Sequence, residues 1–365
     1  MSLTNIKLQN FRNYSSLDLI VPENGCILEG INGSGKSNFL ESVYMICTAR
    51  SQRNAKRHEM INFNNTVTYI EADFLNDDTK TRTNRSIGFS RDKSLVLKIN
   101  GSKVDSIIDW FSTRPVISFG PGDLFLVYGS PEERRKFVDI ICSQVFGDYL
   151  KNLILYKKNL QNRNHLLQGP LNEVHISIYE EQMSFYGSEI VSKRKEFIEK
   201  ILPFFYNSYL SISNGSEHVD LHYLSSFKHN CSSKNDWKNV FLKELVDHRK
   251  RDQKLGFSSF GPHRDDVSIL LDGRAAKNFC SQGQCRSIVL SLKLGSVFFL
   301  EKYLEERMIF LIDDAFSELD SERTSRVLPL LENRGQIFLA VPELKNDLLK
   351  DLVRFRVCNG SIVRQ

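Results

Sequence analysis

One eight-residue stretch near the N-terminus constrains this chain more than any other feature. It reads Gly30-Ile31-Asn32-Gly33-Ser34-Gly35-Lys36-Ser37 and fits the pattern G-x-x-x-x-G-K-[ST] at every fixed position. A strand-like run, residues 25–29, precedes it, and apolar residues at helical spacing follow it to about Cys47. Glycines let the backbone curl so that its N–H groups point inward at phosphate oxygens, and the helix that follows adds the positive end of its dipole. The stretch therefore predicts a phosphate-binding loop in an α/β fold.

Three kinds of side chain would carry the chemistry of such a loop. Lys36 supplies a mobile cation for the β- and γ-phosphates, and the hydroxyl of Ser37 is a ligand for Mg²⁺. Residues 308–312 form an apolar run typical of a buried strand, which ends in Asp313 and Asp314. The carboxyl ends of strands in an open α/β sheet face the ligand crevice. We expect Asp313 to hold Mg²⁺ through water and Asp314 to polarise the attacking water.

A second anion site is predicted downstream. Ser281-Gln282-Gly283-Gln284 begins a predicted helix, so a serine hydroxyl, glycine-exposed backbone N–H groups and a helix N-terminus come together. One chain does not need two binding sites for a γ-phosphate, so we expect this motif to contact a nucleotide bound by a second copy of the chain. The alternative is an N-cap turn without a ligand. A further segment, Ser317-Glu318-Leu319-Asp320, follows the acidic pair.

The pattern of predicted elements divides the chain into two lobes. The first hundred residues are rich in strands, residues 131–206 show helical spacing, and the last hundred alternate helix and strand. Lys36 and Asp313 must nevertheless meet at one nucleotide. We therefore expect a mixed sheet with helices, formed by residues 1–115 and 255–365, split by a mainly helical insertion over residues 116–254.

Composition excludes several classes of protein. Hydrophobic residues make up 41% and charged residues 25% of the 365, which is typical of a globular chain. No apolar run approaches the roughly 18 residues that a membrane span needs, so no span is expected, and the N-terminus shows no secretory signal. The net charge of +5 permits a nucleic-acid partner without requiring one. Seven scattered cysteines without a CxxC pair indicate free thiols in a reducing, cytoplasmic setting.

Several basic clusters leave two interpretations open. Each could contact nucleotide or DNA phosphates, or form a solvated charged face. The segment Gly261-Pro262-His263-Arg264-Asp265-Asp266 is also ambiguous: Arg264 could pair with Asp265 or Asp266 as a structural clamp, or the segment could lie near the nucleotide. The clusters are Arg50, Arg53, Lys56 and Arg57; Lys193, Arg194, Lys195 and Lys200; and Arg249, Lys250, Arg251 and Lys254.

Taken in order, the motifs resemble a known family. Ile6-Lys7-Leu8-Gln9-Asn10-Phe11-Arg12, the phosphate loop, S-Q-G-Q and D-D-x-x-S-E-L-D are similar to the ABC-type ATPase heads of the SMC and RecF group. Within that group the chain most resembles the RecF family. The likeness spans nearly the full chain and includes three further blocks, which are residues 129–135 (GSPEERR), 161–164 (QNRN) and 261–266 (GPHRDD).

This resemblance implies a function as well as a fold. It implies an ABC-type P-loop ATPase lobe with an inserted helical lobe, ATP and Mg²⁺ as ligands, and head-to-head homodimerisation on ATP binding. It also implies binding to double-stranded DNA at gaps or junctions in recombinational repair, replication restart and the SOS response. RecR, acting with RecO to load recombinase, is the implied protein partner. By position, residues 30–37 would bind ATP and Asp313 would bind Mg²⁺. Asp314 would occupy the position of the catalytic acid. Residues 281–284 would form the trans-acting motif, and residues 317–320 would form the loop that faces the dimer partner.

Three features depart from a generic ABC pattern. Asp314 stands where glutamate is commoner, Val341 is followed by Pro342-Glu343 where transporter ATPases place a histidine, and no convincing Q-loop glutamine is found. They indicate slow, switch-like hydrolysis, a weak DNA-stimulated ATPase at most. Two other classes remain open, the ATPase subunit of a membrane transporter and a phosphotransferase for a small substrate. The missing histidine and the large insertion count against the first, and SQGQ and SELD against the second.

Overall fold

The computed structural model forms two compact units. It describes residues 2–76, 78–92, 94–111, 115–170, 172–213, 217–227, 234–304, 306–313, 326–327, 329–332, 334–342, 349 and 351–365. Unit 1 comprises Met1–Asp123 and Glu301–Gln365, and unit 2 comprises Leu124–Leu300. The boundaries predicted from the sequence, after residues 115 and 254, differ from these. Residues 255–300 group with unit 2 because the strand Asp266–Leu271 pairs there with β9 (Val219–Leu224) and Phe299 packs edge-on against Phe197.

The first sheet of unit 1 is antiparallel, with the order β2-β1-β4-β5-β6-β7. One face is apolar: Ile6 of β1 lies opposite Leu19 on one side and Ala72 on the other, and all three are buried. Asn100-Gly101 is a sequence favoured in two-residue hairpin turns, and both residues adopt the positive φ that such a turn requires. The strands are β1 (Ser2–Phe11), β2 (Tyr14–Ile20), β4 (Val67–Leu75), β5 (Arg82–Ser90), β6 (Leu95–Ile99) and β7 (Ser102–Val104).

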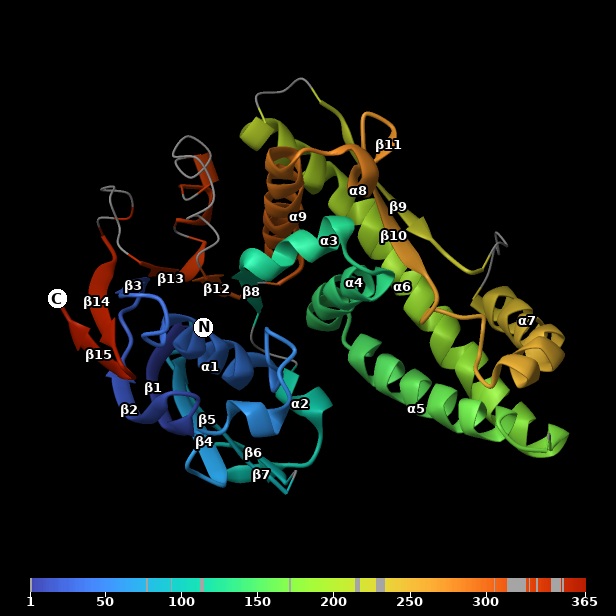
Figure 1. Cartoon of the computed structure of the whole chain (residues 1–365), viewed down its shortest axis with the longest axis horizontal. Coiled ribbons are helices and arrows are strands. Elements are labelled where there is room, and N and C mark those ends of the chain that lie inside the picture. Colours follow the sequence, from blue (N-terminus) through green and yellow to red (C-terminus); the bar gives the residue numbers. More distant parts are fainter. Residues whose placement is uncertain are drawn as a thin grey trace. The chain divides into compact units, whose positions relative to one another are not determined.

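The second sheet of unit 1 has the order β15-β14-β3-β13-β12-β8, and only β15 is antiparallel. Every residue of β12 and β13 is buried, as expected for central strands of a parallel sheet. Helix α1 (Lys36–Thr48) contacts strands of both sheets and lies between them (Figure 1). The strands are β3 (Gly25–Glu29), β8 (Val116–Phe119), β12 (Met308–Asp313), β13 (Gly335–Val341), β14 (Val353–Cys358) and β15 (Ser361–Arg364).

Short helices complete unit 1 and lead out of it. They are η1 (Arg57–Met60), α2 (Ile107–Phe111) and η2 (Pro121–Leu124). The predicted mixed α/β lobe is thus confirmed, although it contains two sheets that sandwich α1 rather than a single mixed sheet.

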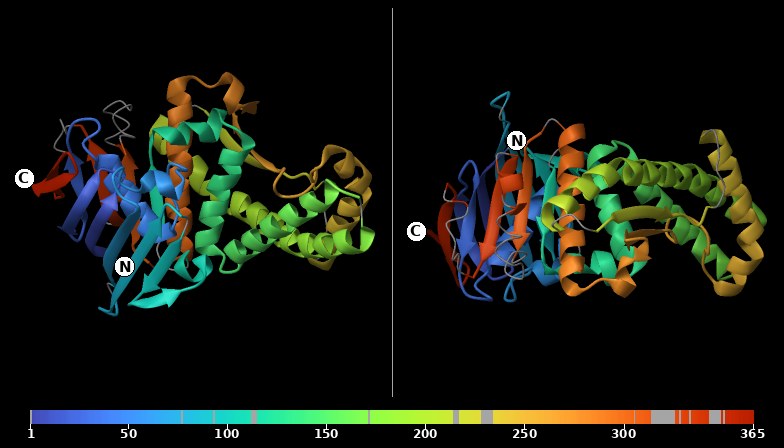
Figure 2. Two further views of the ribbon diagram at one scale, coloured as in Figure 1. Left: turned by 60° about the horizontal axis from the view of Figure 1, so that its bottom comes forward. Right: turned by 90° about the horizontal axis from the view of Figure 1, so that it is seen from above.

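Unit 2 is mainly helical, as predicted. The 41-residue α6 (Glu173–Ser213) runs through it and contacts α4, α5, α7 and β9 (Figure 2). A three-stranded antiparallel sheet, β11-β10-β9, accompanies the helices. The other elements are α3 (Phe125–Tyr128), α4 (Pro131–Val145), α5 (Tyr149–Leu167), α7 (Lys234–Leu255), β10 (Asp266–Leu271), β11 (Arg274–Ala275), α8 (Ala276–Phe279) and α9 (Gln282–Tyr303).

Buried charges join the helices of unit 2. Arg163 of α5 has no exposed side-chain surface, and it pairs with Glu180 of α6 at 3.1 Å and with Asp252 of α7 at 2.7 Å. Arg194 of α6 pairs with Asp139 of α4 at 2.9 Å. Removing one member of such a group leaves an uncompensated buried charge, which is strongly destabilising. These contacts give the 161–164 block, and Arg194 of a basic cluster, a structural role.

The proposed clamp in the 261–266 segment has different partners from those predicted. Asp266 pairs with Arg134 of α4 at 2.7 Å, and Asp265 accepts hydrogen bonds from the hydroxyl of Tyr223 and the backbone N–H of Ser226. Arg264 donates instead to the carbonyl oxygen of Ser258, and its guanidinium lies over the ring of Phe257. Pairing of Arg264 with Asp265 or Asp266 was one of two interpretations left open by the sequence; in the structure Arg264 has other partners, because residues remote in sequence bind both carboxylates.

Candidate nucleotide site

The phosphate loop lies between β3 and α1, where the sequence predicted it. Gly33 and Gly35 have φ angles of 82° and 122°, in the region that only glycine adopts without strain. A Cβ on Gly35 would lie 2.7 Å from Nδ2 of Asn13. The hydroxyl of Ser34 is buried and has no hydrogen-bond partner among the described residues. A loop with glycines at positive φ and an unsatisfied buried hydroxyl has the features of an anion cradle.

Lys36 closes the loop on itself. Its Nζ donates to the carbonyl oxygens of Gly30 at 2.6 Å and Ile31 at 3.1 Å. Helix α1 starts with no side-chain cap and no acidic residue in its first turn. The N–H groups of that turn therefore remain for a ligand, and the helix dipole favours a negative one.

Ser37 and Asp313 are brought together although 276 positions separate them. The Ser37 hydroxyl donates to Oδ1 of Asp313 at 2.6 Å. Asp313 ends β12, whose parallel neighbour β13 pairs in turn with β3, the strand that leads into the phosphate loop. This sheet order carries the carboxylate to the first turn of α1. Hydroxyl and carboxylate oxygens are the ligands that Mg²⁺ prefers, so these two residues fit the metal.

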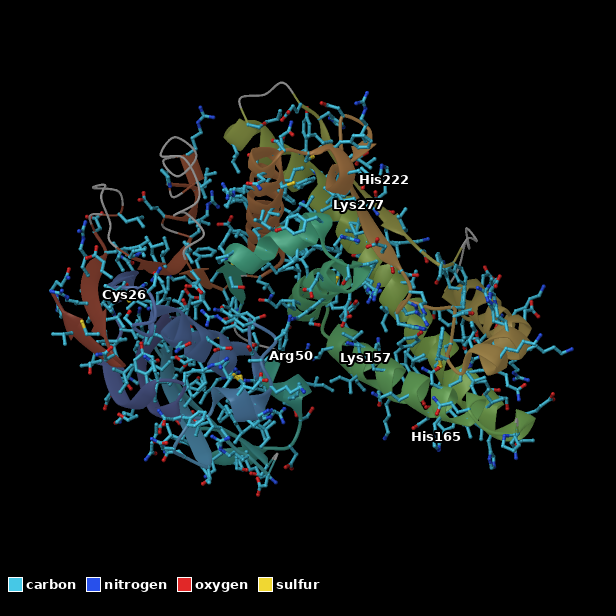
Figure 3. All side chains as sticks on the ribbon, in the orientation of Figure 1. Cys26, Arg50, Lys157, His165, His222 and Lys277 are labelled. Carbon is cyan, nitrogen blue, oxygen red and sulfur yellow. The ribbon has the colours of Figure 1, made fainter. Side chains whose placement is uncertain are left out.

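Arg53 adds a positive charge at the same carboxylate. Its Nη2 lies 3.1 Å from Oδ2 of Asp313, and its side chain is 42% exposed. Of the predicted basic cluster, Arg53 thus reaches the site. Arg50 follows the C-terminal end of α1 (Figure 3), and Lys56 is exposed on the segment that leads into η1.

The turn between β1 and β2 braces the loop, which sequence reasoning missed. Asn13 donates from Nδ2 to the carbonyl oxygen of Ser34 at 3.0 Å, and the hydroxyl of Tyr14 donates to the carbonyl oxygen of Gly35 at 3.0 Å. Asn38 of α1 donates to Oδ1 of Asn13 at 2.9 Å. The only available signal was that Asn13 and Tyr14 directly follow the 6–12 block.

The SQGQ motif of unit 2 forms the N-terminus of α9. The backbone N–H of Ser281 donates to Oε1 of Gln284 at 2.7 Å, and the N–H of Gln284 donates to the Ser281 hydroxyl at 3.2 Å. This reciprocal pair is a capping box. Ser281 and Gln282 are exposed, while Gly283 and Gln284 are partly covered. The motif is therefore an ordered cap whose serine is accessible.

The two thiols beside this motif, Cys280 and Cys285, have raised pKa values. Burial raises the pKa of Cys280 to about 11, and it also raises the pKa of Cys285. Burial likewise raises the pKa of Cys26 on β3 to about 12 (Figure 3). Within the described part of the chain, no three His, Cys, Asp or Glu residues are grouped to hold a metal ion. A metal at Asp313 would therefore depend on oxygens from Ser37, the nucleotide and water.

Some predicted site residues lie outside the described residues. These are Asp314, Ser317, Glu318, Leu319, Asp320 and Glu343. Pro342 is described, and its carbonyl oxygen accepts a hydrogen bond from the N–H of Gly30 at 3.2 Å. The end of β13 thus lies at the start of the phosphate loop.

Comparisons with known proteins match nearly the whole chain to one family. The family model described as RecF/RecN/SMC N terminal domain matches residues 2–355. The chain is 36% identical over 373 residues to the DNA replication and repair protein RecF of Clostridium beijerinckii, covering 100% of this chain and 99% of that protein. It is 34% identical over 369 residues to the protein of the same name from Streptococcus gordonii, covering 99% and 100%.

Solved structures point the same way. A structure of the recombination mediator protein RecF-ATP in the RecFOR pathway superposes with a TM-score of 0.91 at 28% identity, covering 100% of this chain and 97% of that one. An Smc head bound to the C-winged helix domain of ScpA gives a TM-score of 0.58 at 14% identity and supports the fold alone. None of the helices in the described residues has the length and apolar character needed to cross a bilayer.

Proposed function

The chain belongs to the RecF family, and on this premise we propose that it is an ATP-gated DNA-binding protein of recombinational repair and replication restart. One observation carries the proposal. The 2.6 Å hydrogen bond from Ser37 to Asp313 joins the phosphate loop to the end of β12, so a single centre can hold a nucleotide and its metal. Residues from distant parts of the sequence would surround the nucleotide in such a site, so nucleotide binding can be coupled to the rest of the protein.

The proposed ATP site consists of residues 30–37. Lys36 would exchange the carbonyl oxygens of Gly30 and Ile31 for the β- and γ-phosphates, since a phosphate is the stronger acceptor. The buried hydroxyl of Ser34 would gain the partner that it lacks among the described residues. The uncapped first turn of α1 would supply further N–H donors.

Ser37 and Asp313 would hold Mg²⁺, which when bound offsets the charge of the β- and γ-phosphates. Both residues already lie within hydrogen-bonding distance of each other. Arg53 would have to release Oδ2 of Asp313, and its half-exposed side chain has room to do so. We assign the polarisation of the attacking water to Asp314, and its short carboxylate is consistent with slow hydrolysis that acts as a release switch.

Two chains would close head to head, with residues 281–284 of each facing the nucleotide of the other. The Ser281 hydroxyl and the N–H groups of the first turn of α9 are donors suited to a γ-phosphate. We also place residues 317–320 at this interface. The motif would thereby make dimerisation depend on ATP.

The closed dimer would bind duplex DNA at gaps or junctions and assist RecR and RecO in loading recombinase in the cytoplasm. A net charge of +5 per chain is modest, so strong binding would require two chains together. Contacts to phosphates would dominate, giving affinity that falls steeply with salt and little sequence preference.

Sedimentation with and without ATP and a gapped duplex tests this proposal. The wild-type chain is expected to dimerise and to bind DNA tightly only with ATP. Lys36→Ala should lose ATP binding and remain a weakly binding monomer, because the loop then lacks its phosphate cation. If Lys36→Ala binds DNA as well as the wild-type chain in the presence of ATP, gating by the nucleotide is ruled out.

A further inference from the structure

We propose that Glu217 is a positioning residue for the trans-acting motif. Its carboxylate holds the side-chain amide of Gln284 in the one orientation that leaves the Ser281 hydroxyl free to donate to a phosphate on a second copy. The inference rests on the proposed function of residues 281–284 and adds to the site a residue that lies outside every motif of the sequence.

Glu217 lies between the end of α6 and the start of β9 and uses both carboxylate oxygens. Its Oε1 accepts a hydrogen bond from Nε2 of Gln284 at 2.5 Å, and its Oε2 accepts one from the hydroxyl of Tyr209 at 2.5 Å. Tyr209 is fully buried on α6. The carboxylate therefore ties the first turn of α9 to the core of unit 2 across 67 positions of sequence.

The chemistry of the amide makes this contact directional. A carboxylate can only accept, so Nε2 of Gln284 must face Glu217 and Oε1 must face the other way. On that other side, Oε1 accepts the backbone N–H of Ser281 at 2.7 Å. If the amide were reversed, its NH₂ group would meet the N–H of Ser281 and the carboxylate would meet an oxygen. Glu217 thus selects the orientation that closes the capping box.

The closed box determines what Ser281 offers to a ligand. Its oxygen accepts the backbone N–H of Gln284 at 3.2 Å, and no described residue accepts its hydroxyl hydrogen. The side chain is exposed, so that hydrogen is available as a donor. The carboxylate charge is itself held by Gln284 and Tyr209, both of which donate to it. A single acidic residue thereby arranges a donor for an anion without presenting a free oxygen to it.

Three variants distinguish a positioning role of Glu217 from a general effect on folding. Glu217→Ala removes the acceptor, and we expect it to raise the ATP concentration for half-maximal dimerisation by about tenfold or more, because a hydrogen bond to a charged group is lost. Glu217→Gln keeps a carbonyl oxygen for Nε2 of Gln284 and should stay within about threefold of the wild-type chain. Tyr209→Phe deletes the other contact of Glu217 and should also stay within about threefold, since Gln284 keeps its partner.

Two readouts distinguish a positioning role from a structural one. Each monomer should bind a fluorescent ATP analogue with unchanged affinity, because the phosphate loop lies in unit 1. Mixing Glu217→Ala with Lys36→Ala should restore ATP-dependent dimers, since the first supplies an intact phosphate loop and the second an intact motif. A variant that was simply misfolded would not be rescued in this way.

The outcomes separate this inference from the function on which it rests. If the wild-type chain does not dimerise with ATP, the proposed function fails and the inference falls with it. If the wild-type chain dimerises and Glu217→Ala dimerises equally well, the inference alone is overturned. It is also overturned if Glu217→Gln is as defective as Glu217→Ala, because charge and not orientation would then be what matters.

Discussion

At the scale of single residues, the phosphate loop shows two kinds of glycine. Gly33 and Gly35 both have positive φ, but a Cβ on Gly33 would meet nothing within 4 Å, whereas one on Gly35 would meet Asn13 at 2.7 Å and the Tyr14 hydroxyl at 3.0 Å. The pattern G-x-x-x-x-G-K-[ST] fixes Gly35 and leaves position 33 open. The structure explains the difference, because Gly33 has only a backbone requirement and Gly35 a steric one as well.

Alanine at these two positions should therefore have unequal effects. Gly33→Ala is expected to lower the free energy of unfolding by about 1 kcal/mol, the cost of a left-handed alanine. Gly35→Ala should cost about 2–4 kcal/mol, because the new methyl group also displaces the brace formed by Asn13 and Tyr14. Urea unfolding of the full chain measures both. Equal losses would show that the Asn13 brace yields freely.

Arg53 offers a test of how the metal carboxylate is held. Its guanidinium pairs with one carboxylate oxygen of Asp313. Removing the guanidinium should therefore make it easier for Mg²⁺ to bind that oxygen. A half-exposed ion pair is worth up to about 1 kcal/mol, so Arg53→Ala should lower the Mg²⁺ concentration for half-maximal ATP binding by about two- to fivefold. Lys56→Ala, an exposed basic neighbour with no contact to Asp313, is the matched control. A higher Mg²⁺ requirement in Arg53→Ala would mean that the guanidinium assists the nucleotide instead.

At the scale of elements, local patterns could be predicted from the sequence, whereas contacts between elements far apart in the sequence could not. The strand–loop–helix around residues 30–37 and the Asn100-Gly101 hairpin follow from short-range spacing, which reports backbone requirements directly. The brace from Asn13 and the hold of Glu217 on Gln284 join elements far apart in sequence. Nothing in the spacing of either residue marks it, because one long-range hydrogen bond leaves no periodic trace.

The 261–266 segment shows the same limit. Its composition suggested an internal clamp, and the sequence alone could not reveal that Arg134 binds Asp266 and Tyr223 binds Asp265. Its histidine was equally ambiguous. In the structure His263 shares a 2.7 Å hydrogen bond with the hydroxyl of Tyr156 on α5 and contacts the carbonyl oxygen of Ser258, which makes it a packing residue of unit 2.

His263 should make unit 2 sensitive to acid. Burial, reinforced by Arg264 and Arg135 and opposed by the Ser258 carbonyl, lowers its pKa from 6.5 to about 4. Between these values the unfolded chain binds a proton that the folded chain does not, so stability is present above pH 6.5 and is lost as the pH falls towards 4. The loss at pH 5 should be about 1–2 kcal/mol.

Urea unfolding at pH 7 and pH 5 checks this expectation. His263→Gln should be less stable at pH 7 but lose less stability on going to pH 5 than the wild-type chain does. His165→Gln replaces an exposed histidine on α5 (Figure 3) and should keep the wild-type pH dependence. If His263→Gln retains the full acid sensitivity, other groups in unit 2 are responsible for it.

At the scale of the whole molecule, the order of the motifs along the chain is what made the family recognisable. Unit 1 combines residues from both ends of the chain, so the phosphate loop and Asp313 share one core while unit 2 is inserted between them. The trans-acting motif lies in the inserted unit and the nucleotide loop in the other. If the motif acts on a second copy, each composite site draws on both chains, and a lesion in one unit can be complemented by a partner carrying a lesion in the other.

Ser281→Arg tests that arrangement directly. Ser281 is exposed and caps α9, so an arginine there removes the hydroxyl donor and places a long cation at the interface, at a cost of about 1 kcal/mol to the helix cap. We expect ATP-induced dimerisation to be abolished in sedimentation experiments while the monomer binds ATP nearly as tightly as the wild-type chain. Ser281→Thr keeps both hydroxyl and cap and should still dimerise. Loss of ATP binding by the Ser281→Arg monomer would instead place the motif in cis, and the two-chain site would have to be abandoned.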